Sequence, residues 1–162
     1  INGLTDITLP AAQLASLTLR TARIFVTESE NNGLAFPEMA ESVVLFGLRY
    51  DDGRLAEVPW LRDRPLHYWG DISARGFASL DRMRTSFPQT VSFLMDRGTF
   101  LAHQRSWVTV PDDERPPAEL SHLSADELAL CDDLLNDRFG TGVRLNQEDV
   151  SYRWLRRTLE RL

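Results

Sequence analysis

Lysine is absent from this chain of 162 residues, cysteine occurs once, and no apolar run is long enough to cross a bilayer. The single cysteine excludes an internal disulfide, and no histidine stands at a zinc-ligand or catalytic spacing from it, so we interpret Cys131 as a core residue in a reducing compartment. Without a membrane span or a signal peptide, the sequence predicts a cytoplasmic protein that does not bind membranes.

The missing lysine leaves arginine as the only basic residue besides histidine, and the formal net charge is -6. Nucleic-acid binding depends on cationic side chains that displace counterions, so this balance argues against a free-standing nucleic-acid-binding protein. Each arginine cluster predicts either a local basic patch or, more commonly, a solvated helix face. The clusters are Arg62 and Arg64; Arg82 and Arg84; and Arg153, Arg156, Arg157 and Arg161.

Several familiar site motifs are also missing. The sequence contains no G-x-G-x-x-G, no G-x-x-x-x-G-K-[ST] and no G-x-S-x-G, so it supports neither a nucleotide-binding loop nor a serine nucleophile. His67, His103 and His122 stand far apart, which makes a zinc site a poor interpretation. We interpret His67 as a satisfied histidine within a buried strand.

The length suits one domain with a packed core. The chain begins with isoleucine rather than methionine, so we expect it to be part of a longer protein. We interpret residues 1–22 as a connecting segment and residues 23–162 as the domain, with a C-terminal helical extension.

Strand and helix patterns alternate along the chain, which predicts an α/β fold with a roughly four-stranded, mostly parallel sheet, flanking helices and additional C-terminal helices. The run 42–46 is continuously apolar, so we expect it to be buried on both faces. The expected strands are 23–27, 42–46, 66–70 and 90–95, and the expected helices are 9–19, 76–87, 124–139 with Ser124 as N-cap, and 147–162.

The first, third and fourth of these strands each run into an acid, which is Asp96 for the fourth. Glu28 follows the first strand and Asp71 follows the third. The carboxyl ends of parallel strands open onto one crevice, so these acids can converge on a hard metal ion, and we expect their carboxylates within about 8 Å of each other. Asp71 also begins a short extended stretch in which Ser73 points to the same side, before Gly76 leads into a helix.

An acid after strand one and an Asp-x-[acid or polar] pair after strand three resemble the Toprim fold of topoisomerases, bacterial primases and some nucleases. In that family a glutamate and an Asp-x-Asp pair hold Mg²⁺ against phosphodiester oxygens. Glu28 matches the glutamate and Asp71 the first aspartate, while Ser73 stands where the second aspartate is usual. The segment 70–77 is also similar to that of the topoisomerase VI A subunit and its meiotic relatives.

A resemblance to the C-terminal domain family of JetD proteins covers most of the chain, through the segments 26–37, 65–72, 92–96 and 143–148. It implies a nuclease domain of the bacterial Wadjet system, which pairs an SMC-type complex with a topoisomerase-VI-A-like subunit to cut plasmid DNA. It further implies a DNA-binding arm that precedes the domain, double-stranded DNA and SMC-type subunits as partners, and Mg²⁺ or Mn²⁺ as cofactor; it leaves a homodimer open.

The resemblance assigns roles to four residues. Glu28 is expected as a metal ligand or general base, Asp71 as the principal ligand, and Ser73 as a weak ligand or water anchor. Arg75, near a helix start, is expected to meet a DNA phosphate. No tyrosine is placed as a covalent nucleophile, which favours hydrolysis over strand passage.

The substitution at Ser73 weakens a second metal site, and Asn146 replaces another acid that is usual in such proteins. Glu30, Asp96 and Glu148 are candidates to compensate. Their alternative interpretations are a solvated loop for Glu30, a helix N-cap for Asp96 and a first-turn acid for Glu148.

Two other functions stay open at this point. One is a DNA-binding or assembly module of the same complex with a weakened catalytic site. The other is a small-molecule phosphohydrolase on a Rossmann-like scaffold, since a fold alone does not fix the substrate.

Overall fold

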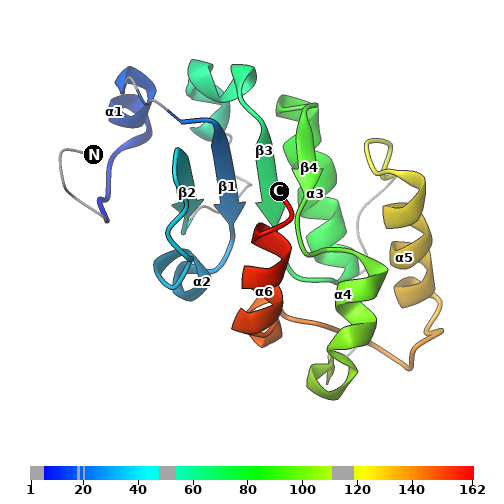
Figure 1. The fold of residues 1–162 in the computed structure, drawn as a ribbon. Helices are drawn as coiled ribbons and strands as arrows, with labels where there is room; N and C mark the ends of the chain where they lie inside the picture. Colours follow the sequence, from blue (N-terminus) through cyan, green and yellow to red (C-terminus); the bar gives the residue numbers. More distant parts are fainter. Residues whose placement is uncertain (1–5, 18, 20, 48–53, 111–118) are drawn as a thin grey trace.

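A four-stranded parallel sheet forms the centre of the computed structural model, which describes residues 6–17, 19, 21–47, 54–110 and 119–162. The strands lie in the order β2-β1-β3-β4, and each neighbouring pair is parallel. The C-terminal ends of all four strands therefore lie along the same side of the sheet (Figure 1). The predicted α/β class is confirmed. Their bounds are β1 Arg23–Thr27, β2 Ser42–Phe46, β3 Leu66–Trp69 and β4 Thr90–Ser92.

The central strands carry the core of the sheet. Ile24 and Val26 of β1 and Leu66 and Tyr68 of β3 are fully buried. The expectation that residues 42–46 are buried on both faces is wrong, because β2 lies at the sheet edge and only Leu45 of this strand is buried. An apolar run therefore does not distinguish an edge strand from a central one.

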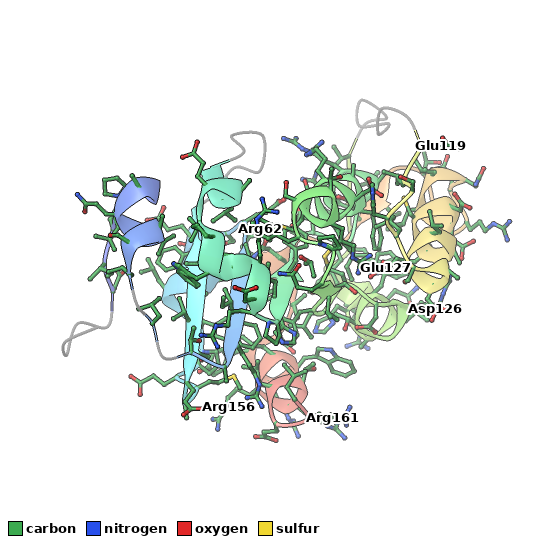
Figure 2. The ribbon with its side chains drawn as sticks, turned by 90° about the horizontal axis from the view of Figure 1, so that it is seen from above. Arg62, Glu119, Asp126, Glu127, Arg156 and Arg161 are labelled. Atoms are coloured by element: carbon green, nitrogen blue, oxygen red, sulfur yellow. The ribbon has the colours of Figure 1, made fainter. Side chains whose placement is uncertain are left out.

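Helices cover both faces of the sheet. α6 (Tyr152–Leu159) lies on one face and α3 (Ala74–Ser86) on the other, where α5 (Ala125–Leu135) packs against α3 (Figure 1, Figure 2). The other elements are α1 Ala11–Ser16, α2 Glu30–Leu34, α4 Arg97–Ala102, the 3-10 turns η2 Arg54–Glu57, η3 Pro59–Asp63, η4 Gln104–Ser106 and η5 Gln147–Asp149, and the antiparallel pair β5 Val108–Thr109 and β6 Val143–Arg144.

The last helix is shorter than the sequence predicts. Residues 147–149 form a 3-10 turn, and α6 begins only at Tyr152, because the hydroxyl of Ser151 caps it by accepting a hydrogen bond from the Trp154 N–H. The segment before the cap therefore lies outside α6, and in this segment the backbone N–H of Gln147 donates a hydrogen bond to Asp71.

Other expectations about local structure are confirmed. Ser124 and Glu127 form a reciprocal capping box at the start of α5. Cys131 is buried in the core, and its burial raises the pKa of its thiol to about 11. None of the helices in the described part of the chain is long and apolar enough to cross a membrane.

Candidate functional site

Glu28 and Asp71 lie at the same edge of the sheet because their strands are neighbours. In the register of β1 and β3, Thr27 stands beside Trp69. Glu28 is the first residue after β1, and Asp71 is the second residue after β3. The topology that the predicted convergence requires is therefore present, while a separation within about 8 Å stays a prediction.

A core tyrosine orients the Glu28 carboxylate. Tyr68, fully buried in β3, donates its hydroxyl hydrogen to Glu28 Oε1 at 2.5 Å. Gly70 leaves room for this hydroxyl, since a Cβ at that position would lie 2.7 Å from the tyrosine oxygen. Glu28 itself is exposed. Tyr68 binds its carboxylate from the side of the core through Oε1, and Oε2 takes no part in this hydrogen bond.

Asp71 is half-buried, and its Oδ1 accepts a hydrogen bond from the backbone N–H of Gln147 at 2.8 Å. Burial raises the pKa of Asp71, and the negative charges of Glu28 and Glu148 raise it further, against the lowering effects of the Gln147 hydrogen bond and the Arg144 guanidinium. The net pKa lies above the usual aspartate value. A cation bound beside these carboxylates would relieve their mutual repulsion.

Gln147 connects the two acid-bearing segments. Its backbone holds Asp71, and its side-chain amide donates a hydrogen bond from Nε2 to Thr27 Oγ1 at 2.5 Å, one residue before Glu28. The residue is 2% exposed, and its Oε1 is buried without a hydrogen-bond partner among the described residues. A buried acceptor of this kind is satisfied by an ordered water or a hydrated cation.

Ser73 caps the helix that follows Asp71. The serine is buried, and its Oγ accepts a hydrogen bond from the Gly76 N–H at 3.0 Å. Gly76 permits a close approach, because a Cβ there would lie 2.0 Å from the Asp71 carbonyl oxygen. Arg75 is exposed in the same first turn. The predicted roles of Ser73 as a weak ligand and of Arg75 as a phosphate contact stay predictions.

The three acids proposed as compensating ligands have different surroundings. Asp96 uses both carboxylate oxygens to cap α4, accepting from the Thr99 N–H at 2.9 Å and the Thr99 hydroxyl at 2.7 Å, so its interpretation as an N-cap is confirmed. Glu30 is exposed, but its interpretation as a loop residue is wrong, because it lies in the first turn of α2. Glu148 is exposed in η5, and its charge acts on Asp71.

The donor set fits a weakly coordinated cation rather than a closed metal cage. Within the described ranges, no group of three or more histidine, cysteine or carboxylate residues is placed to hold a metal ion. Mg²⁺ usually keeps several waters and binds through one or two carboxylates together with substrate phosphates. Glu28 and Asp71, each with one oxygen outside the hydrogen bonds described above, match that requirement.

The family described as "Wadjet protein JetD, C-terminal" matches residues 1–159. The chain belongs to this family. No curated protein matches the chain. Membership of the JetD C-terminal family confirms the expected family and associates the chain with the Wadjet system; the relation to Toprim domains and to topoisomerase VI stays a prediction.

Two residues of the site, Tyr68 and Gln147, were not predicted from the sequence. Both lie within segments that resemble the JetD C-terminal family, 65–72 and 143–148, so a signal was present. Their hydrogen bonds join positions 40 and 76 residues apart in the chain. The resemblance marks the segments, but it does not show which side chains pair across that range.

Proposed function

We propose that this chain is the metal-dependent, DNA-cleaving domain of a Wadjet plasmid-defence protein. The observation that carries the proposal is the pair of carboxylates at the shared edge of β1 and β3, each fixed by a hydrogen bond and coupled in charge, in a chain of the JetD C-terminal family. Paired acids of this kind serve metal-assisted phosphodiester hydrolysis.

Each side chain of the site has a part in that reaction. Asp71 and Glu28 would hold a divalent cation, which would supply Lewis acidity for polarising a phosphoryl oxygen and for lowering the pKa of a water. Tyr68 keeps the Glu28 carboxylate in one orientation, and Gln147 does the same for Asp71. Glu28, exposed and with Oε2 outside the tyrosine hydrogen bond, is also the candidate to accept a proton from the attacking water.

The proposed partners follow from the same function. Double-stranded plasmid DNA is the substrate, SMC-type subunits deliver it, and the cytoplasm is the site of action. Because the chain carries a net charge of -6, we propose that the isolated domain holds duplex DNA weakly near physiological salt and depends on the rest of the assembly for affinity.

Plasmid cleavage by the full-length protein with its partner subunits tests this function. With Mg²⁺ or Mn²⁺ we expect nicked or linear product, and with Glu28→Ala we expect no cleavage but nearly unchanged DNA binding, because the glutamate acts on metal and water rather than on phosphate charge. Undiminished cleavage by the Glu28 variant would refute the assignment.

A second candidate is a DNA-binding or assembly module whose catalytic site has weakened. It is favoured by Ser73, whose oxygen is engaged in capping α3 in the place where the Toprim pattern has a second aspartate. The same assay separates the two functions, since this module would bind DNA without cutting it in the presence of either metal.

A further inference from the structure

The C-terminal helix α6 presents a row of arginines to solvent. Arg153, Arg156 and Arg157 in α6, and Arg161 just beyond its end, are all exposed. None of their guanidinium groups forms an ion pair or a hydrogen bond with any residue that the structure describes. Elsewhere in the protein, Arg84, Arg97 and Arg138 pair with acids. We call the four exposed residues the α6 arginine face.

Helix stability explains only part of this arrangement, because Arg156 and Arg157 lie in the last turn of α6, where a cation favours the helix dipole. Arg153 and Arg157 are four residues apart, as are Arg157 and Arg161, and like charges at that spacing destabilise a helix by about 0.2–0.5 kcal/mol per pair. Arg153 also lies in the first turn, where a cation opposes the helix dipole. The whole chain has a net charge of -6, but Glu160 is the only acidic residue of its sequence after Asp149. An anionic partner would relieve the repulsion.

The helix is held firmly in place. Leu155 and Leu159 pack into the core. At the N-terminal end, the Ser151 N–H donates to His103 Nε2 at 3.1 Å, and the Trp154 indole donates to Thr99 Oγ1 at 3.1 Å. At the C-terminal end, Arg23 donates to the carbonyl of Leu162 at 3.2 Å. The α6 arginine face is therefore fixed relative to the sheet before any ligand binds.

The same segment of chain holds the candidate catalytic carboxylate. Gln147, which hydrogen-bonds Asp71, lies in η5, and α6 begins five residues later. In Figure 1, α6 begins beyond the ends of β1 and β3 and the chain then runs back over the sheet, and Figure 2 shows Arg156 and Arg161 in this segment, well apart from Arg62.

From these observations we infer that the α6 arginine face binds the phosphate backbone of duplex DNA and holds it beside Glu28 and Asp71. From Arg153 to Arg161 the chain advances about 12 Å at helical rise, a length over which duplex DNA presents several phosphates. Arginine suits this contact because its planar guanidinium binds phosphate oxygens in pairs. The contact is independent of base sequence. This inference rests on the proposed function for its substrate but concerns binding alone.

Its test is DNA binding by the full-length protein without divalent metal, so that cleavage plays no part. Fluorescence anisotropy with a labelled duplex at several salt concentrations compares wild type, Arg153→Gln/Arg157→Gln and the matched control Arg62→Gln/Arg64→Gln, which removes the same charge from an exposed cluster before β3. We expect the α6 variant to bind about tenfold more weakly at moderate salt, with the slope of log K against log salt reduced by about 2, and the control to behave as wild type.

Unchanged binding and slope in the α6 variant would overturn the inference, as would equal losses in both variants, which would indicate net charge alone. Normal DNA binding combined with lost association with partner subunits would identify the face as a protein interface and overturn it too. Cleavage that persists in Glu28→Ala would refute the proposed function without affecting this result.

Discussion

The ion pair between α3 and α5 predicts a pH-dependent contribution to stability. Arg84 donates to both carboxylate oxygens of Glu127, at 2.5 and 2.9 Å, and both side chains are largely buried. Burial raises the pKa of Glu127, but the hydrogen bonds from Arg84, Ser92 and the Ser124 N–H and the charge of Arg84 outweigh it, so the pKa falls from 4.5 to about 2. We therefore expect Glu127→Gln to destabilise the protein at neutral pH.

The magnitude follows from the two pKa values. A folded-state pKa of about 2 against 4.5 in the unfolded chain corresponds to about 3 kcal/mol. Because the folded-state pKa is depressed, this contribution is fully present above the unfolded-state value and is lost as the pH falls toward the folded-state value. At pH 3 we expect about 1 kcal/mol to remain.

Urea unfolding of wild type and Glu127→Gln between pH 3 and pH 7 measures this contribution. Asp126→Asn is the matched control, because Asp126 is a neighbouring acid in the same first turn but is exposed (Figure 2). We expect the control to change stability by less than about 1 kcal/mol at any pH. A Glu127→Gln deficit that stays constant down to pH 3, or one matched by Asp126→Asn, would refute the reasoning.

Three further predictions concern the candidate site. Gly76→Ala should lower stability by about 1–3 kcal/mol in thermal unfolding, because its Cβ would collide with the Asp71 carbonyl oxygen 2.0 Å away. Ser73→Asp should keep the cap of α3, since aspartate also caps helices, while tightening Mn²⁺ binding in calorimetry; unchanged affinity would mean that another acid already supplies that charge. Mn²⁺ affinity should weaken with falling pH, and at a higher pH than for an unperturbed aspartate, because burial and then the charges of Glu28 and Glu148 raise the pKa of Asp71. Glu148→Gln should shift that weakening to lower pH, and an unmoved titration would contradict the assigned coupling.

Much of the fold could be predicted because its signals are local. The apolar runs predicted the positions of β1 and β3, and Ser124 as N-cap predicted the start of α5. The lateral order of the strands is not local, which is why the edge position of β2 was missed. The length of α6 was overestimated. The helix begins only at Tyr152 rather than at residue 147, because Ser151, inside an otherwise helical pattern, caps it there.

In the candidate site too, residues marked by a local pattern could be predicted, and residues placed by long-range contacts could not. Glu28 and Asp71 could be found because each follows a recognisable strand. Gln147 could not, because its role depends on the chain returning to the edge of the sheet through the bridge between Ile72 and Leu145. Ser73 shows a further difficulty, since one hydroxyl position suits both a helix cap and a weak ligand. Among the described residues, the only hydrogen bond of this hydroxyl is the cap of α3.

Mn²⁺ binding followed by electron paramagnetic resonance tests most directly whether Glu28 and Asp71 share a cation. The samples are wild type, Glu28→Gln, Asp71→Asn and, as a control, Asp126→Asn on the distant α5. We expect saturable binding by wild type and the control. In each site variant we expect the Mn²⁺ affinity to be at least about tenfold weaker, since even indirect partners of a metal contribute that much. Absent binding by wild type, or equal affinity in all four proteins, would contradict the proposed metal site.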